Sequence, residues 1–252
     1  MSAPVFIADH GSLRDVVPGG SYLLDGTEGR HAGVVQRRSP GERVDVVDGH
    51  GTRLIGVVEA VTGDGVVVAV REVVVETEPS VLLVLVQALA KGDRDEMAIE
   101  AATEVGVDAV IPWQAERSIV VWRGDRAVKS RSRWSSTVRS AAKQSRRARV
   151  PEVELPLDGR GLVERVRSVV DAGGVVLVLH EEATEPIADV TLPEQGECLV
   201  VVGPEGGIGE VELTRLTDAG ATAVRLGPHV LRTSTAGPVA VAVLAQRLGR
   251  WA

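Results

Sequence analysis

From Val81 onward, apolar runs of strand length alternate with segments whose apolar residues recur at helical spacing. The run "VLLVLVQAL" (81–89) is almost continuously apolar, as expected for a strand buried on both faces. A helix is predicted to begin at Asp93, where Glu96 three residues later completes a capping box. Alternation of this kind is typical of a mostly parallel sheet with helices on both faces, so the fold class is predicted as α/β.

The same alternation continues to the end of the sequence. Further strands are predicted at 107–111 (ended by Pro112), 175–180, 198–202 and 221–226, and further helices at 125–147, 162–170, 210–219 and 235–248. The last of these helices is apolar on most faces, so we expect it to be buried.

The first part of the sequence has a different pattern. Valine-rich runs at 43–47, 53–61 and 66–75 are separated by the turn sequences "DGHG" and "TGDG", which predicts short antiparallel strands of a small β-barrel. A short helix is predicted at 31–37. The polar stretch "ETEPS" (76–80) then marks a boundary, giving domains at residues 1–75 and 76–252.

The sequence predicts no membrane span, no internal disulfide and no metal site. No apolar stretch reaches the roughly 18 to 20 residues that span a bilayer, and the N-terminal sequence does not resemble a signal peptide. The single cysteine, Cys198, lies in an apolar run, which favours a reducing cytoplasm. The five histidines lack metal-ligand spacing, so no metal is expected.

The formal net charge of −7 hides a basic segment. Residues 123–149 hold ten Lys or Arg and one acid, so their local charge is +9 and that of the remaining chain is −16. A basic segment on an acidic protein favours a polyanionic partner over a merely solvated helix face, more so because Trp134 lies inside it. The candidate RNA-binding residues are Arg131, Arg133, Arg139, Lys143, Gln144, Arg146 and Arg147.

Three predicted strands of the second domain are followed by unusual turns: "LHEE" (179–182), "GPEGG" (203–207) and "LGPHVLRTS" (226–234). Ligands of open α/β sheets bind beyond the carboxyl ends of the strands, and glycines let the backbone approach a ligand closely. No lysine follows these glycines as in a phosphate loop, and "GPEGGIG" lacks dinucleotide spacing, so ATP and NAD are disfavoured. "GPEGG" alone is also compatible with a simple strand-to-helix turn.

Four segments together resemble one known family. They are "KGDRDEMAIEAATEVGVDAVIPWQAERS" (91–118), "AAKQSRRARVPEV" (141–153), "VVGPEGGIGEVEL" (201–213) and "LGPHVLRTSTA" (226–236). In order and spacing they are similar to the RsmE family, the 16S ribosomal RNA uridine-N3 methyltransferases of the trefoil-knotted SPOUT superfamily. The resemblance covers nearly the whole chain.

This resemblance implies a C-terminal trefoil-knotted domain, a PUA-like N-terminal barrel that binds RNA, a homodimer, and ribosomal RNA of the small subunit as the partner. It also implies S-adenosylmethionine as the cofactor, bound by the three turns. The corresponding residues are Leu179, His180, Glu181, Gly203, Pro204, Glu205, Gly206, Gly207, Leu226, Gly227, Pro228, Val230, Leu231 and Arg232.

Two positions depart from the family pattern. Ser234 stands in "LRTSTA" where the family often has Glu, and Lys143 replaces another family Glu, so no catalytic role passes from those carboxylates to this chain. Uridine N3 carries a proton with a pKa of roughly nine, by analogy with other weak acids. The predicted catalytic residues are therefore Arg232, a permanent cation for the uridine anion, Glu205 as the carboxylate base, and Ser234. The rival functions are 2′-O-ribose methylation and non-catalytic RNA binding in ribosome assembly.

Overall fold

The computed structural model describes residues 3–251 and divides into two compact units. Of the described residues, the first unit comprises 3–78 and 142–150, and the second comprises 79–141 and 151–251. The first division lies three residues beyond the predicted boundary at residue 75. Residues 142–150, expected in the second domain, pack with the first unit instead.

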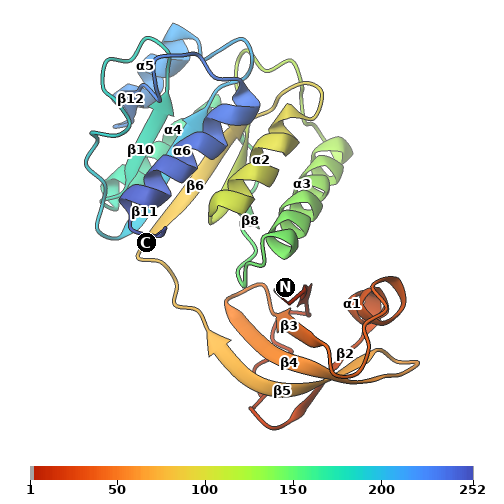
Figure 1. Ribbon diagram of the computed structural model, residues 1–252. Helices are drawn as coiled ribbons and strands as arrows, with labels where there is room; N and C mark the ends of the chain where they lie inside the picture. Colours follow the sequence, from red (N-terminus) through yellow and green to blue (C-terminus); the bar gives the residue numbers. More distant parts are fainter. Residues whose placement is uncertain (1–2, 252) are drawn as a thin grey trace. The chain divides into compact units, whose positions relative to one another are not determined.

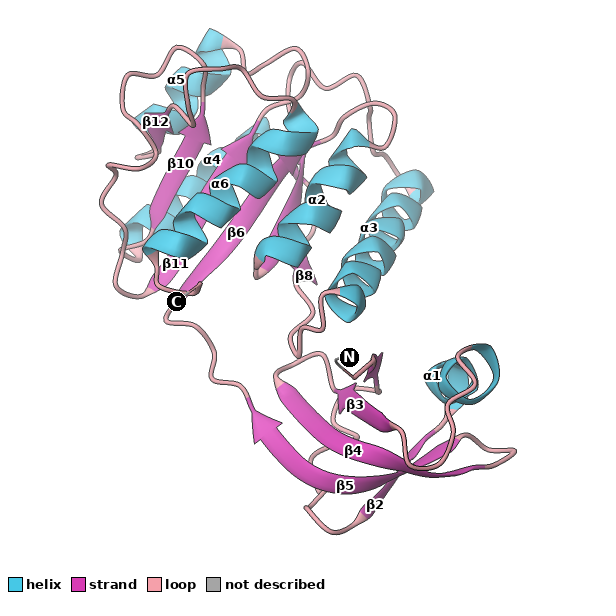
Figure 2. Cartoon of the chain, viewed as in Figure 1, coloured by secondary structure: helices cyan, strands magenta, loops and turns pink. Residues whose placement is uncertain are grey.

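The second unit contains a seven-stranded sheet in which every pairing is parallel (Figures 1 and 2). Its strands are β6 (Val81–Ala88), β7 (Ala109–Gln114), β8 (Glu152–Val153), β9 (Leu157–Asp158), β10 (Val175–Leu179), β11 (Gly196–Val202) and β12 (Thr222–Val224). Their order is β12-β10-β11-β6-β7-β8, with β9 also paired to β7. The predicted parallel α/β architecture is thus confirmed.

Helices cover both faces of this sheet. The helices are α2 (Arg94–Val105), α3 (Asp125–Gln144), α4 (Gly159–Asp171), α5 (Glu210–Asp218) and α6 (Thr233–Arg247). Helices α4 and α5 bury Leu162, Val166 and Leu216 against one face, while α2 and α6 lie together on the other (Figure 1). The central strand β6 is therefore buried on both sides, which explains its almost continuous apolar sequence.

Two local predictions for the second unit are wrong. Strand β7 does not stop before Pro112 but continues to Gln114. Pro112 lies between the residues of β7 that pair with β8 and those that pair with β9, so its missing N–H costs no ladder bond there. Helix α2 begins after Asp93 as predicted, but Asp93 has a φ of 59° and makes no side-chain capping bond.

The first unit is built on a five-stranded sheet of order β1-β3-β4-β5-β2. Its elements are β1 (Val5–Ile7), β2 (Ser21–Leu24), α1 (Gly26–Arg30), the π-helix η1 (His31–Val35), β3 (Arg43–Val47), β4 (Thr52–Val61) and β5 (Val66–Val75). The β1–β3 pairing is parallel and the others are antiparallel. Within residues 3–251 no pairing joins the edge strands β1 and β2, so the sheet is an open half-barrel and the predicted small β-barrel is not confirmed.

Residues 142–150 are integral to the first unit. Ala148 shares a small apolar core with Val5, Ile7 and Val47. The Lys143 ammonium lies 2.7 Å from the Glu28 carboxylate and 5.0 Å from the centre of the Phe6 ring. The end of the basic segment therefore takes part in the packing of this unit.

Candidate cofactor and RNA site

The three turns singled out in the sequence line one pocket at the carboxyl ends of β10, β11 and β12. Its cavity volume is about 1120 Å³, at the upper end of ligand pockets. All fourteen residues predicted to bind the cofactor lie in its wall. Arg94, Arg117, Glu182, Glu210, Arg225 and His229 also line it. The geometry thus brings together three segments that are distant in the sequence.

A buried polar chain ties the second turn to the third. The Thr233 hydroxyl donates to the Gly203 carbonyl oxygen at 2.8 Å, and the Gln87 side-chain amide donates to the same hydroxyl at 2.9 Å. Gln87 is fully buried and Thr233 is only 6% exposed. The polar end of β6 therefore holds the start of α6 against the turn after β11.

Gly203 and Gly227 serve this pocket in different ways. A Cβ at Gly203 would lie 2.7 Å from the Ile208 side chain, so that glycine permits the tight packing of the turn itself. A Cβ at Gly227 would meet nothing within 4 Å, so that glycine leaves open space in the wall. Gly203 thus allows the turn to pack tightly, whereas Gly227 leaves space that a ligand can occupy.

Arginines outside the three turns stabilise the "GPEGG" turn. Arg117, from the loop after β7, donates to the Gly206 carbonyl oxygen at 2.9 Å. Arg94 lies 2.7 Å from Glu205, whose carboxylate also accepts the Lys91 backbone N–H at 3.1 Å. Partial burial opposes ionisation of Glu205, but these bonds and one from its own N–H outweigh it and lower the pKa of the carboxyl.

The three predicted catalytic residues are placed differently. Arg232 and Glu205 line the pocket, whereas Ser234 lies in the first turn of α6 and is not part of the pocket wall. The Arg232 carbonyl oxygen accepts the N–H groups of Thr235 and Ala236, which fixes the Arg232 backbone. Its guanidinium is exposed and has no hydrogen-bond or ion-pair partner in the described part of the chain. A cation held in this way is available to an anionic ligand.

Sequence reasoning missed the residues that hold the pocket together, namely Gln87, Arg94, Arg117 and Thr233. The one sequence signal for them is Gln87, a polar residue near the end of an otherwise apolar strand. A buried polar side chain needs a partner, so it marks a place where another segment must supply one.

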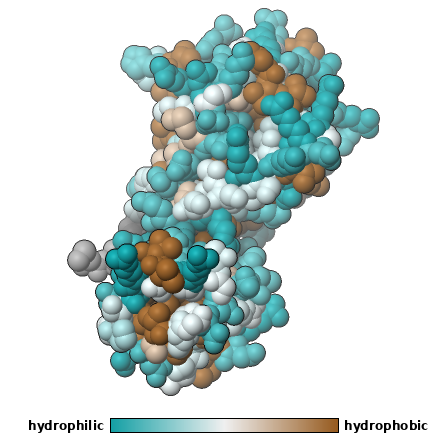
Figure 3. Space-filling model, turned by 90° about the vertical axis from the view of Figure 1, so that its right-hand side faces the viewer, coloured by the Kyte–Doolittle hydropathy of each residue, from teal (hydrophilic) through white to brown (hydrophobic). Residues whose placement is uncertain are grey.

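The basic segment is only partly free to bind RNA. Arg131 donates to the Val153 and Glu154 carbonyl oxygens, Arg133 pairs with Glu96, and Lys143 pairs with Glu28. Arg139, Gln144 and Arg146 are exposed, and Arg147 is partly so. Figure 3 faces the side of Figure 1 on which α3 lies, and its surface is largely hydrophilic with scattered apolar residues.

Arg126 and Lys129 were not among the predicted RNA-binding residues, but they are more accessible to a polyanion than the paired residues are. They are exposed on one side of α3, and neither has a hydrogen-bond or ion-pair partner among residues 3–251. Trp134, which favoured an RNA surface in the sequence, is instead 1% exposed and packs its ring edge-to-face on Trp122 with centroids 5.2 Å apart. Its position in the basic segment therefore reflects packing.

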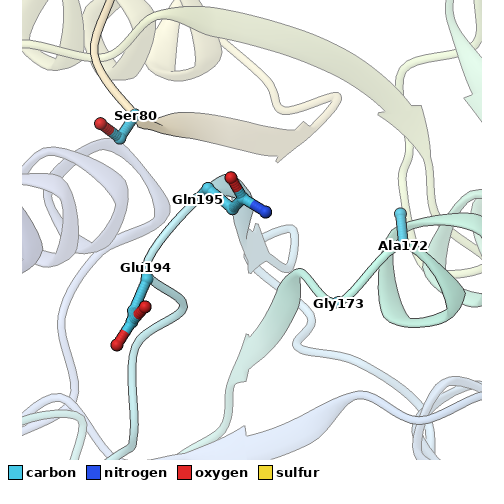
Figure 4. Close-up of a pocket in the computed structure, with 5 residues that line it drawn as sticks. All are labelled: Ser80, Ala172, Gly173, Glu194 and Gln195. Carbon is cyan, nitrogen blue, oxygen red and sulfur yellow. The ribbon is translucent and has the colours of Figure 1, made fainter.

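A smaller hollow of about 430 Å³ lies at the opposite, amino ends of β6, β10 and β11, lined by Ser80, Ala172, Gly173, Glu194 and Gln195 (Figure 4). Between residues 3 and 251 no three His, Cys, Asp or Glu side chains gather as metal ligands. None of the described helices is both long and apolar enough to cross a bilayer.

Comparison with known proteins agrees with this geometry. Residues 77–245 match the model of the RNA methyltransferase domain. The chain is 50% identical to ribosomal RNA small subunit methyltransferase E of Mycobacterium bovis, covering 100% of this chain and 94% of that protein, and 31% identical to that of Bacillus subtilis, covering 86% of each.

A solved structure extends the likeness to three dimensions. The methyltransferase E of Neisseria gonorrhoeae, determined with bound S-adenosyl methionine, has a TM-score of 0.83 and 27% identity, and 98% of each chain is covered. The match therefore includes both units of the chain. On these grounds the chain belongs to the family of ribosomal RNA small subunit methyltransferase E.

Proposed function

We propose that this chain transfers a methyl group from S-adenosylmethionine to N3 of a uridine in 16S ribosomal RNA. The observation that carries the proposal is the single pocket formed by the turns after β10, β11 and β12. The reaction class follows from the family to which the chain belongs. The structure of the Neisseria gonorrhoeae member was determined with S-adenosyl methionine bound.

The residues of the pocket fit such a cofactor. Glycine-rich backbone at 203–207 and open space beside Gly227 suit the edge of a planar base. Glu181, Glu182 and Glu210 are acidic residues of the wall that would attract a cationic sulfonium. When bound, the cofactor supplies an activated methyl group. The cavity also exceeds what a ligand of that size fills, which leaves room for a nucleobase.

Arg232 is the residue best suited to the developing negative charge of the uridine. Its backbone is fixed by two hydrogen bonds at the start of α6, and its guanidinium is unpartnered among the described residues. A permanent cation stabilises an anion without needing to change its own protonation. This stabilisation lowers the cost of removing the N3 proton.

Glu205 is a poor candidate for the base. Its lowered pKa and its ion pair with Arg94 keep it ionised but weakly basic at neutral pH. We assign it instead to holding the loop at Lys91 and Arg94 beside the "GPEGG" turn. Ser234, outside the pocket wall, then needs no chemical role.

The finer architecture belongs to the same proposal. The family to which the chain belongs is the ground for a trefoil knot in the second unit, and the three turns that line the pocket are the candidate knot loops. The exposed apolar side chains Met97, Val230 and Val239 support a homodimer. The half-barrel of the first unit is the candidate PUA-like RNA-binding module, and a buried Cys198 suits a cytoplasmic protein.

The test is methyl transfer followed by mapping of the product. Purified protein, labelled S-adenosylmethionine and unmodified small subunits or 16S ribosomal RNA are incubated, and the nucleosides are separated by mass spectrometry. We expect N3-methyluridine. Recovery of a 2′-O-methyl nucleoside would replace the proposed reaction with ribose methylation. Absence of heat on titration with the cofactor would favour a non-catalytic RNA-binding protein.

A further inference from the structure

Two histidine rings pack edge to face on the surface of the first unit. His10 follows β1 and His50 lies in the turn between β3 and β4. Their ring centroids are 4.0 Å apart and their planes are inclined by 67°. Both residues are exposed. The pair therefore presents exposed aromatic rings to the solvent.

Such a surface is unusual in this chain. Phe, Trp and Tyr make up only 2% of the sequence, and Phe6, Trp113 and Trp134 are fully or almost fully buried. These three aromatic rings therefore pack in the core, away from water. The two histidine rings are exposed to water, so core packing does not explain why they lie together.

The turn that carries His50 is fixed by its own hydrogen bonds. The Asp48 carboxylate accepts the backbone N–H of His50 at 2.7 Å and that of Thr52 at 3.0 Å. Gly51 donates its N–H to the Ala148 carbonyl oxygen at 3.2 Å. The backbone at His50 is thus held by the same strand-like contact that joins this turn to residues 148–150.

This contact places the pair beside the end of the basic segment. His50 forms an isolated bridge with Arg149, and Val150 donates to the Gly49 carbonyl oxygen at 2.9 Å. Arg146 and Arg147 precede this contact directly in the chain. Within the first unit, exposed aromatic rings and a run of arginines therefore adjoin each other. Proteins that bind unpaired nucleic acid combine these two features.

We propose that His10 and His50 form a stacking site for an unpaired base of the RNA, which stacks on an exposed imidazole face. The inference rests on the proposed function, because it assumes an RNA substrate. It specifies that the first unit recognises a single-stranded segment, since the bases of a duplex already stack on their neighbours and present no free face.

The experiment compares RNA binding by the full-length protein and three variants. The probes are a short unstructured RNA oligonucleotide and the duplex formed with its complement, and affinity is measured by fluorescence anisotropy over a range of salt concentrations. The variants are H10A/H50A, which removes the rings, H10F/H50F, which keeps two aromatic faces without imidazole, and R126Q/K129Q as the electrostatic control.

We expect H10A/H50A to lose about 5- to 100-fold in affinity for the single strand, the range measured for base–aromatic stacking. Its salt dependence and its affinity for the duplex should match the wild type, because stacking releases no counterions. H10F/H50F should retain most of the affinity. The control should lose affinity for both probes and show a shallower salt dependence.

Three results would overturn the inference. The first is single-strand affinity of H10A/H50A equal to that of the wild type, and the second is an equal loss on both probes. The third is failure of H10F/H50F to restore binding while its thermal unfolding is unchanged, since this would assign the effect to imidazole. Failure of the proposed function looks different: the wild type would then transfer no methyl group to ribosomal RNA whatever the variants bind.

Discussion

Replacing Thr233 by Val removes one hydroxyl and leaves the shape of the side chain almost unchanged. The hydroxyl donates to the Gly203 carbonyl oxygen and accepts from Gln87, so one partly buried and one buried hydrogen bond disappear. Gln87 retains a bond to the Ala88 carbonyl oxygen, whereas Gly203 loses its side-chain donor. The substitution therefore leaves one partly buried carbonyl group short of a donor.

The size of the effect follows from these partners. A net hydrogen bond contributes about 1 kcal/mol, and a buried polar group left unsatisfied costs about 1 to 3 kcal/mol. We expect Thr233→Val to lower the free energy of unfolding by about 2 to 4 kcal/mol. The two turns would also lose their tie, so affinity for S-adenosylmethionine should fall in the protein that remains folded.

Tryptophan fluorescence is the natural probe for this experiment. All four tryptophans, at positions 113, 122, 134 and 251, lie in the second unit, so their emission during urea unfolding reports on that unit. Thr235→Val is the matched control, because Thr235 is exposed in the same helix. Surface changes of this kind alter stability by about 0.5 kcal/mol or less.

A double-mutant cycle with Gln87→Met isolates the pairwise energy. Coupling of about 0.5 kcal/mol or more between positions 87 and 233 is expected for residues in one network. If Thr233→Val is no more destabilising than Thr235→Val, or if the cycle shows no coupling, the polar chain does not hold the pocket and our account of it is wrong.

Four further predictions follow from the same structure. Gly203→Ala should weaken cofactor binding in calorimetry, because its Cβ would press on Ile208 from 2.7 Å. Arg232→Lys should lower the single-turnover methylation rate about tenfold to a thousandfold, and Arg167→Lys is the control. The methylation rate should also rise from neutral to mildly alkaline pH. A flat pH profile together with a fully active Arg232→Lys variant would exclude the mechanism. Burial raises the pKa of the Glu212 carboxyl, so the folded state binds its proton more tightly than the unfolded state does. As the pH rises above about 4.3, the free energy of unfolding of the wild type should therefore fall relative to that of Glu212→Gln, as measured by urea titration. Neutralising Arg126 and Lys129 should reduce the salt slope of RNA binding by about 0.7 to 0.9 for each lost phosphate contact.

Much of the fold was predictable because its strands are long and rich in valine. The runs predicted at 43–47, 53–61 and 66–75 match β3, β4 and β5 to within one residue. Strands β1, β2, β8 and β9 have four residues or fewer, which is too short for a period of two to stand out. Strand β7 was cut short because Pro112 ordinarily ends a strand, and only the positions of β8 and β9 remove that objection.

The pocket was predictable for a related reason. Glycine-rich turns can be recognised in the sequence, and parallel strands bring their carboxyl ends to one edge of the sheet. The supporting contacts were not predictable, because they join residues far apart in the chain. Glu205 and Arg94 are 111 positions apart and Thr233 and Gln87 are 146 apart. The sequence-based prediction of Glu205 as the base was made without the contact to Arg94, and that contact is the ground for our proposal that Glu205 holds the loop instead.

The basic segment shows why a charge count does not identify a binding surface. Its ten cations look equivalent in the sequence, but a cation that pairs with a carboxylate or caps a carbonyl group has already exchanged its hydration for a protein partner. Recruiting Arg131 or Lys143 to a phosphate would break the contacts with Val153 or Glu28, and that cost is subtracted from the binding energy. Arg126 and Lys129 bear no such cost, so they should contribute more to RNA binding than residues that carry the same formal charge.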